Sequence, residues 1–179
     1  MITVFIFAIS ESGLLSMFPV YGLRIGYQPQ EFATFLLAMG LGNVVFQIPI
    51  GFLIDRINTT LLFVSFALLG FLGAVMIPFI SHNVIIFAII VFFWGGIIPG
   101  LYTLGLSRIG SRFDGAELAA ANSVFVMNYS IGMLIGPVIV GFGMNSWDPH
   151  GAMWIMALIF GLYSIYILSF RFFVTSKIG

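Results

Sequence analysis

The chain has 179 residues and a formal net charge of zero, and 61% of its residues are hydrophobic while 7% are charged. This composition leaves too little polar surface to coat a soluble globule, so it indicates a protein that crosses a membrane several times. The balanced charge gives no indication of a nucleic-acid partner, and the absence of cysteine excludes disulfides and thiolate-bound metals.

Six stretches of the chain are apolar enough to cross ~30 Å of hydrocarbon, at about 20 residues per helical span. They are residues 2–23, 32–54, 60–80, 84–106, 118–142 and 152–172. The apolar runs are continuous, without the alternation typical of a membrane β-barrel, so we expect helices. The links are short. The sequence therefore predicts an all-α membrane protein in which residues 1–179 form a single bundle of six transmembrane helices.

The first span carries an acidic residue, Glu11, near its middle. An ionised carboxylate at the centre of a bilayer costs ~2.5–3.5 kcal/mol on insertion scales, so we expect Glu11 to face the bundle interior or to be protonated. No other carboxylate lies deep in a span, which makes Glu11 the candidate proton carrier of a transport pathway. The alternative is a structural role, in which Ser10, Ser12 or a neighbouring helix hydrogen-bonds the carboxylate.

The second span contains two amides and ends in a charged pair. Asn43 and Gln47 lie four residues apart on one helical face, where they are candidates for binding a substrate or for holding helices together. Gly51 is expected to let the helix end pack closely on a neighbour. Asp55 and Arg56 follow at the membrane surface, where we expect contacts that change during a gating motion. For Arg56 the alternative is a plain anchoring role.

The fourth span is interrupted by glycine and proline between positions 95 and 100, and such broken helices line transport pathways in membrane carriers. Trp94 and Tyr102 flank the interruption and are candidate pathway residues. Packing within the bundle, or anchoring at the membrane interface, is the alternative for both aromatic side chains.

Two arginines follow the fourth span, Arg108 and Arg112, and their spacing of four places them on one helical face. We interpret them as anchors at the membrane surface, or as partners of Asp55 or Glu117 in gating contacts, with Arg112 the stronger candidate for gating. Asp114 is predicted to cap the next helix, together with Glu117 three residues later.

The fifth span combines Gly132 and Gly136, which permit close contact with another helix, with Pro137, which removes a backbone donor and loosens the helix. We therefore expect this helix to flex. Asn128, one turn earlier in the span, is a further candidate pathway residue, and Asn122 and Tyr129 are weaker candidates in the same span.

Two of these segments resemble the major facilitator superfamily. Residues 51–56 are similar to its cytoplasmic loop signature G-x-L-x-D-R-x-G-R-R/K, although residues 57–60 lack the second glycine and the basic pair. Residues 132–137 are similar to the G-x-x-x-G-P motif of facilitator helices, most strongly of exporters. The resemblance covers essentially the whole chain and implies a transporter that works by alternating access.

The resemblance also implies that the chain is one half of a facilitator, because a complete one has twelve helices in two halves. Each half consists of two inverted three-helix repeats, which would be residues 1–80 and 84–172 here. The order of the motifs and the basic tail at residues 171–177 favour the carboxy-terminal half. We therefore expect an amino-terminal six-helix partner, either missing here or supplied by another chain.

The basic residues are distributed unequally between the two faces of the predicted bundle. One face receives Arg56, Arg108, Arg112, Arg171 and Lys177, and the other receives only Arg24. Because short cytoplasmic loops retain Lys and Arg, we expect both termini to be cytoplasmic, in a bacterial plasma (inner) membrane.

Enzymatic functions are disfavoured by the placement of reactive residues. His82 and His150 fall in links at one face and Ser107 at the other, so they cannot form a nucleophile–base pair, and no metal-binding or P-loop motif occurs. We expect no cofactor. The sequence predicts a secondary transporter of a small solute within the lipid bilayer, with a six-span channel or a membrane scaffold as the alternatives. The few buried charges and many aromatic residues favour neutral or amphipathic substrates.

Overall fold

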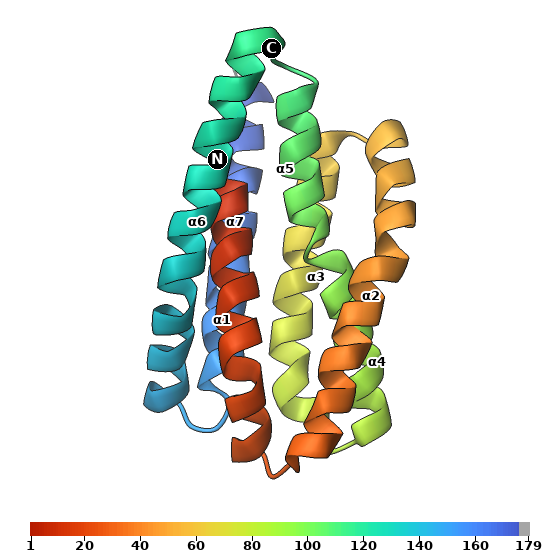
Figure 1. The fold of residues 1–179 in the computed structure, drawn as a ribbon, viewed down its shortest axis with the longest axis vertical. Coiled ribbons are helices and arrows are strands. Elements are labelled where there is room, and N and C mark those ends of the chain that lie inside the picture. The colour runs from red at the N-terminus through yellow and green to blue at the C-terminus, as the bar shows by residue number, and fades with distance from the viewer. Residues whose placement is uncertain (176–179) are drawn as a thin grey trace.

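The computed structural model describes the backbone of residues 1–175 and the side chains of residues 1–169. Within this range the chain forms helices and no strands (Figure 1). The helices are α1 (Ile2–Arg24), α2 (Pro29–Arg56), α3 (Thr59–Ile80), α4 (Val84–Ile97), α5 (Gly100–Gly110), α6 (Gly115–Ser146) and α7 (Gly151–Thr175). Because α4 and α5 together make one span, the described chain has six helical segments long and apolar enough to cross a membrane. The predicted all-α fold with six spans is confirmed.

The link at residues 81–83 has the predicted bounds and the other four links between spans are shorter than predicted, and polar residues at several of these links cap the helices. Asn58 accepts hydrogen bonds from the N–H groups of Thr60 and Leu61, and Asn83 caps α4 in the same way. Glu31 accepts a hydrogen bond from the Gln28 N–H at the start of α2. Each cap satisfies backbone donors that a membrane helix would otherwise leave unpaired at its end, so the helices extend further than hydropathy alone indicates.

The predicted cap of α6 is only half right. Asp114 occupies the N-cap position, but its side chain makes no capping hydrogen bond, and Glu117 lies in the first turn, where a negative charge is favourable near a helix start. The helix also begins and ends outside the predicted bounds of 118–142. Pro137 lies inside a helix that continues to Ser146, so it does not end the helix.

The fourth span breaks where the sequence predicted an interruption. Pro99 has no backbone N–H, and the N–H groups of Leu101 and Tyr102 bond to carbonyls only three residues back, at Ile98 and Pro99. This tighter turn separates α4 from α5. A Cβ on Gly100 would come within 2.5 Å of the Phe66 ring, so the break also lets the chain approach α3 closely.

The helices pack mainly in pairs: α1 on α6, α2 on α4, and α3 on α7 (Figure 1). Glycine allows the first of these interfaces to close. A Cβ added to Gly136 of α6 would contact Ser12 Oγ and come within 2.5 Å of the Ile9 carbonyl oxygen of α1. A Cβ added to Gly132 would lie 2.7 Å from the Ala8 Cβ. The predicted role of Gly132 and Gly136 in close helix contact is confirmed for this α1–α6 interface.

The α2–α4 interface is built in the same way. A Cβ on Gly42 of α2 would overlap the Phe92 carbonyl oxygen of α4, and one on Gly96 would lie 2.8 Å from the Gly42 carbonyl oxygen. Gly51 behaves differently, because a Cβ there would meet nothing within 4 Å. Within the described part of the chain Gly51 makes no close helix contact, so its expected packing stays a prediction, and Gly42 makes the close contact of α2 with α4.

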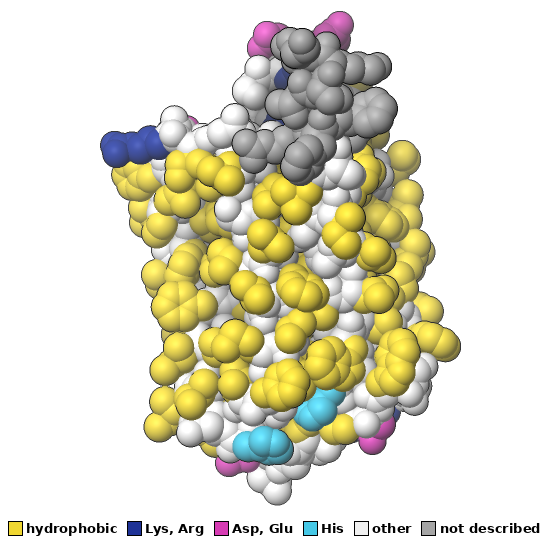
Figure 2. Space-filling model, turned by 180° about the vertical axis from the view of Figure 1, so that it is seen from behind, with side chains coloured by type: hydrophobic (Ala, Val, Ile, Leu, Met, Phe, Trp, Pro, Cys, Tyr) yellow, Lys and Arg dark blue, Asp and Glu magenta, His cyan; other side chains and the backbone are white. Residues whose placement is uncertain are grey.

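On the face that Figure 2 shows, charged side chains lie at the two ends of the bundle and apolar side chains cover the flank between them. The links at residues 57–58 and 111–114 lie at the end where α1 begins and α7 ends, which we call the basic end. It carries Arg56, Arg108 and Arg112, while Arg24 lies at the opposite end. The side chain of Arg171, and Lys177 as a whole, lie outside the described residues.

Candidate functional site

Three of the predicted pathway residues line one cavity. It has a volume of about 290 Å³ and lies between α1, α2 and the broken fourth span. Glu11 contributes from α1, Asn43 from α2 and Trp94 from α4, and most of the remaining lining is apolar, including Phe7, Leu14, Met39 and Ile98. A mostly apolar cavity with a few converging polar groups is the form that small-molecule sites take.

Glu11 is held by a neighbouring helix. The Tyr129 hydroxyl of α6 donates a hydrogen bond of 2.7 Å to Glu11 Oε2. Ser10 and Ser12 do not serve this carboxylate, because their hydroxyls donate to the backbone carbonyls of Ile6 and Ala8, each at 2.9 Å. Of the structural partners expected for Glu11, the neighbouring helix is therefore the one that the structure contains.

Tyr129 is positioned by an aromatic cluster. Its ring lies 5.6 Å from that of Tyr102 and 6.2 Å from that of Phe7, measured between ring centroids. Tyr102 in turn packs edge-on against Phe125 at 5.2 Å. Tyr102 is therefore not part of the cavity lining. It packs against Tyr129, and Tyr129 in turn bonds to Glu11. These rings fix the direction in which the Tyr129 hydroxyl points.

The two amides of α2 face each other as predicted and extend the polar groups away from Glu11. Gln47 Nε2 donates to Asn43 Oδ1 at 3.0 Å, and the Thr103 hydroxyl of α5 donates to Gln47 Oε1 at 3.3 Å. The three side chains form a neutral chain of hydrogen bonds between α2 and α5. Gln47 is exposed and Asn43 only partly covered, so both retain capacity for a further partner.

Trp94 presents only its ring to the cavity. Its indole N–H donates to the Gly70 carbonyl oxygen of α3 at 3.0 Å, and the side chain is buried. The hydrogen-bonding group of Trp94 is therefore already used, and the residue serves the cavity as an apolar wall.

Other predicted residues lie elsewhere. Asn128 is not in the cavity lining. Its amide donates to the Val124 carbonyl of its own helix at 2.8 Å. Asp55 and Arg56 are exposed at the basic end. Arg112 lies at the same end, and among the described residues neither it nor Arg108 forms an ion pair with Asp55 or Glu117.

Sequence reasoning missed Thr103 and ranked Tyr129 only among the weaker candidates. A signal for Tyr129 exists, because it precedes Gly132 by three residues and so lies on the same face as the glycines that contact α1. Thr103 has a weaker signal, since only the break at Pro99 brings α5 beside Gln47.

The end opposite the basic end is held together by polar contacts. Arg24 donates to Asp148, Asn145 and the Met144 carbonyl, and the Tyr21 hydroxyl is 3.0 Å from His150 Nδ1. Burial, with the nearby His82, lowers the pKa of His150 below its usual value, while Asp148 acts in the opposite sense. His150 is therefore neutral near pH 7 and able to share a proton with Tyr21.

Known proteins match this chain over most of its length. The sequence profile of the Major Facilitator Superfamily matches residues 1–178. The chain belongs to the Major Facilitator Superfamily. It is 28% identical over 154 residues to YfkF, an uncharacterized MFS-type transporter of Bacillus subtilis (strain 168), in an alignment that covers 83% of this chain and 38% of YfkF. The chain therefore spans well under half the length of that relative, and family membership points to a role in transport rather than catalysis.

Proposed function

We propose that this chain is one half of a secondary active transporter that moves a small neutral or amphipathic solute by alternating access, with Glu11 carrying a coupled proton. The observation that carries the proposal is the position of the Glu11 carboxylate, which lines a mostly apolar cavity between three spans and is held there by Tyr129. An ionised carboxylate inside a span is energetically costly, so its presence there indicates a partner or a function. The Glu11 carboxylate has a partner in Tyr129 and also lines a cavity.

The neutral amides supply the second part of the proposed site. Asn43 lines the same cavity as Glu11, and Gln47 and Thr103 continue from it toward α5. Amides and hydroxyls can donate to and accept from an uncharged polar solute, while Trp94 and Ile98 offer it an apolar wall. This combination favours solutes with one polar and one apolar part.

Proton coupling through Glu11 is tested by replacing it with Gln in the complete transporter, reconstituted in vesicles. Neutral amphipathic solutes are screened first for one that dissipates an imposed pH gradient, reported by an acridine dye. We expect Glu11→Gln to abolish this solute-evoked proton flux while exchange of labelled solute survives, because the amide keeps the shape but cannot titrate. The matched control is Glu117→Gln, at the exposed start of α6. Proton flux undiminished in Glu11→Gln would assign coupling to the other half.

The requirement for a second half is supported by the surfaces of α2 and α6. Four residues of α2 are buried, Phe32, Phe35, Gly42 and Ile50, whereas α1, which is shorter, buries eleven. Val44 of α2 and Val138 of α6 are each 71% exposed. We infer that part of this surface packs on an amino-terminal half, within a twelve-helix protein of two such units.

This inference can be tested with a carbene photoreagent dissolved in the bilayer, which labels side chains in contact with lipid and needs no thiolate. We expect Val44 and Val138 to be protected from it in the complete transporter. Leu72 of α3 should be labelled, since Leu72 is 50% exposed on a helix that we place against lipid. Equal labelling at all three positions would place α2 and α6 against lipid as well.

The pairing of helices supports two inverted repeats, 1–80 and 84–172. In this arrangement α1 corresponds to the broken fourth span, α2 to α6 and α3 to α7. The α1–α6 contact then corresponds to the α2–α4 contact, and glycine closes both.

We further propose that both termini are cytoplasmic, since three of the four arginines with described side chains lie at the basic end. Reporter fusions at Asn58 and His82 should report cytoplasm and exterior respectively, and the reverse result would invert the orientation.

A further inference from the structure

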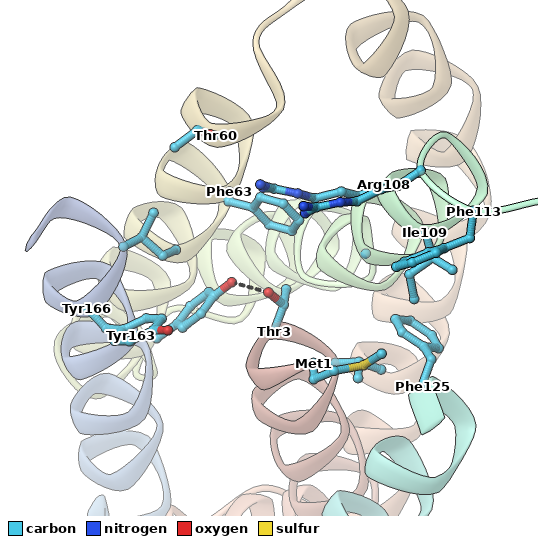
Figure 3. A pocket seen from close by; sticks show the side chains of 14 residues that line it. Met1, Thr3, Thr60, Phe63, Arg108, Ile109, Phe113, Phe125, Tyr163 and Tyr166 are labelled. Carbon is cyan, nitrogen blue, oxygen red and sulfur yellow. Dashed lines mark hydrogen bonds between the residues drawn. The ribbon is translucent and has the colours of Figure 1, made fainter. Parts of the chain in front are cut away.

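A second cavity opens at the basic end of the bundle, away from the site around Glu11. Its volume of about 520 Å³ is within the range of about 300–1,000 Å³ found for ligand sites. The first turns of α1 and α3, the end of α5 with the link that follows it, α6 near Phe125 and α7 near Tyr163 surround it (Figure 3). None of its lining residues belongs to the cavity that contains Glu11 and Asn43.

Two arginines supply the charge of this cavity. Arg108 and Arg112 both line it, and both also line an adjoining hollow of about 390 Å³ with Asn58, Thr60 and Ser111. The guanidinium of Arg108 lies 5.9 Å from the centre of the Phe63 ring, which holds it across the mouth of the cavity (Figure 3). No acidic residue lines either space, and within the described part of the chain neither arginine has an ion-pair partner.

The helix start beside the arginines is already satisfied. Asn58 accepts hydrogen bonds from the Thr60 and Leu61 N–H groups, so these amides at the start of α3 are not available to a ligand. An anion at this position would therefore be held by the guanidinium groups. Arginine suits a phosphate better than any other side chain, because its fork of N–H donors matches two phosphate oxygens at once.

The interior of the cavity is apolar. Phe63, Ile109, Phe125 and Ile167 contribute to its wall, and the Thr3 and Tyr163 hydroxyls bond to each other at 2.6 Å (Figure 3). That bond satisfies the polar groups of the inner wall and leaves them little need of a polar ligand. A charged mouth and an apolar interior together match an amphiphile with one anionic head and a hydrocarbon tail.

We propose that this cavity binds an anionic phospholipid, with its phosphate on Arg108 and Arg112 and the beginning of an acyl chain against Phe63 and Ile109. The helix ends at which the arginines lie are at the depth of lipid head groups in a spanning bundle, and basic pockets between membrane helices are a general form of lipid site. The proposal depends neither on proton coupling nor on which membrane face the basic end occupies. It can therefore be tested without a transport substrate.

The test is a thermal unfolding series on the purified full chain in a neutral maltoside detergent. Phosphatidylglycerol, phosphatidylcholine and inorganic phosphate are added separately. We expect the unfolding temperature to rise with phosphatidylglycerol, with little change for the zwitterionic lipid or the free ion, because a ligand that binds only the folded state stabilises it. An equal rise with inorganic phosphate would replace the lipid by a soluble anion, and an equal rise with phosphatidylcholine would remove the role of charge.

Variants identify the binding groups. Replacing both Arg108 and Arg112 with Gln should weaken phosphatidylglycerol binding by at least about tenfold, the effect of losing one charged hydrogen bond or more. The matched control is Arg56→Gln, at the same end of the bundle but outside both hollows, and it should bind like the parent. If the double Gln variant does not fold, the Arg112→Gln single variant and the double Lys variant are measured instead. Undiminished binding in the variants that fold would overturn the proposal.

Discussion

The α1–α6 and α2–α4 interfaces share a construction but differ in their chemistry. In both, glycine brings two helices into backbone contact, and in both, a polar group beside that contact faces the cavity between α1 and α2. The α1–α6 interface contributes an acid, Glu11, bonded to Tyr129, while the α2–α4 interface contributes a neutral amide, Asn43, bonded to Gln47. One framework used twice can thus carry an ionisable group on one side of a cavity and neutral hydrogen-bonding groups on the other.

This difference suggests a division of roles. Of the two sides, the α1–α6 side carries the ionisable group, so the proton coupling that we propose belongs there. The α2–α4 side keeps the same charge at every pH and can recognise a solute without disturbing that coupling. Filling the glycine contacts should therefore have similar effects on the two sides, whereas replacing the polar groups should have different effects.

The largest effects are expected from filling the helix contacts. Gly42→Ala and Gly136→Ala each place a Cβ against backbone oxygens that cannot move aside, at Phe92 and Ile9 respectively. We expect each to lower the free energy of unfolding by about 3 kcal/mol or more, the upper end of the usual effect of overpacking, because the contacted atoms belong to the backbone. The measurement is unfolding in mixed micelles with a denaturing detergent.

Matched controls lie on the same two helices. A Cβ at Gly40 would meet nothing within 4 Å, and one at Gly141 would lie 3.6 Å from the Met17 sulfur, an ordinary contact. Alanine at these positions should leave stability unchanged or slightly raised, because alanine favours helix more than glycine does. If Gly42→Ala were harmless while Gly136→Ala was not, the two interfaces would not share one construction.

The polar pairs should differ in strength. In double-mutant cycles on stability, we expect Glu11→Gln with Tyr129→Phe to give a coupling energy of about 1.5–3 kcal/mol if the carboxylate is charged, and Asn43→Ala with Gln47→Ala about 0.5–1.5 kcal/mol. A charged acceptor forms the stronger hydrogen bond. The cross pair of Glu11 and Gln47, for which no direct contact exists, serves as the additive control. Equal coupling energies would indicate that Glu11 is neutral in the measured state.

Transport measurements should separate the same two sides. Gln47→Leu removes neutral hydrogen-bonding capacity, so we expect the KM for a polar solute to rise about two- to tenfold, as for one lost neutral hydrogen bond. The number of protons moved per solute should not change. Gln30→Leu, exposed near the start of the same helix, is the control. A change in proton stoichiometry in Gln47→Leu would remove the division of roles.

The spans could be predicted from sequence because hydropathy is a local property, summed over about 20 residues. Their ends were predicted unevenly. The link at residues 81–83 was correct, whereas α2 and α6 each begin three residues earlier than predicted, because first turns that contain Glu31 or Glu117 look like loops in a hydropathy profile. The same limit applies to the site. Glu11 stood out as the one acid deep in a span, and Asn43 and Trp94 were also identified.

A neighbouring helix was among the expected partners of Glu11, but which of its residues faces Glu11 depends on the rotation of α6. Neighbouring residues on a helix point about 100° apart, so Asn128 and Tyr129 cannot both face α1. The contact of Gly132 and Gly136 with α1 fixes that rotation and selects Tyr129. The glycines could be recognised in the sequence, but the helix that they contact could not be predicted from it. The sequence alone therefore could not place Tyr129 rather than Asn128 beside Glu11.

The smallest expected effect concerns the far ends of the two interfaces. Near the end of α1, the Tyr21 hydroxyl lies 3.0 Å from Nδ1 of His150, a side chain that can titrate. In the link before α2, the Tyr27 hydroxyl instead donates to the Ser81 carbonyl oxygen, which cannot titrate. Burial lowers the pKa of His150 below its unfolded value, with His82 acting in the same sense and Asp148 opposing. The folded state therefore prefers neutral His150. Its contribution to stability is complete above the unfolded pKa of about 6.5 and is lost as the pH falls through the lower folded value.

We therefore expect the unfolding temperature of the parent chain to fall slightly between pH 7 and pH 5, and His150→Gln to show a flatter dependence over the same range. His82→Gln is the matched control, since it removes a secondary cause of the lowered pKa and leaves the burial of His150 in place, so most of the pH dependence should remain. Because His150 is only partly covered, solvent screening keeps the effect small. An identical pH dependence in the parent and in His150→Gln would show that this end of the α1–α6 interface is as insensitive to pH as its counterpart at α2.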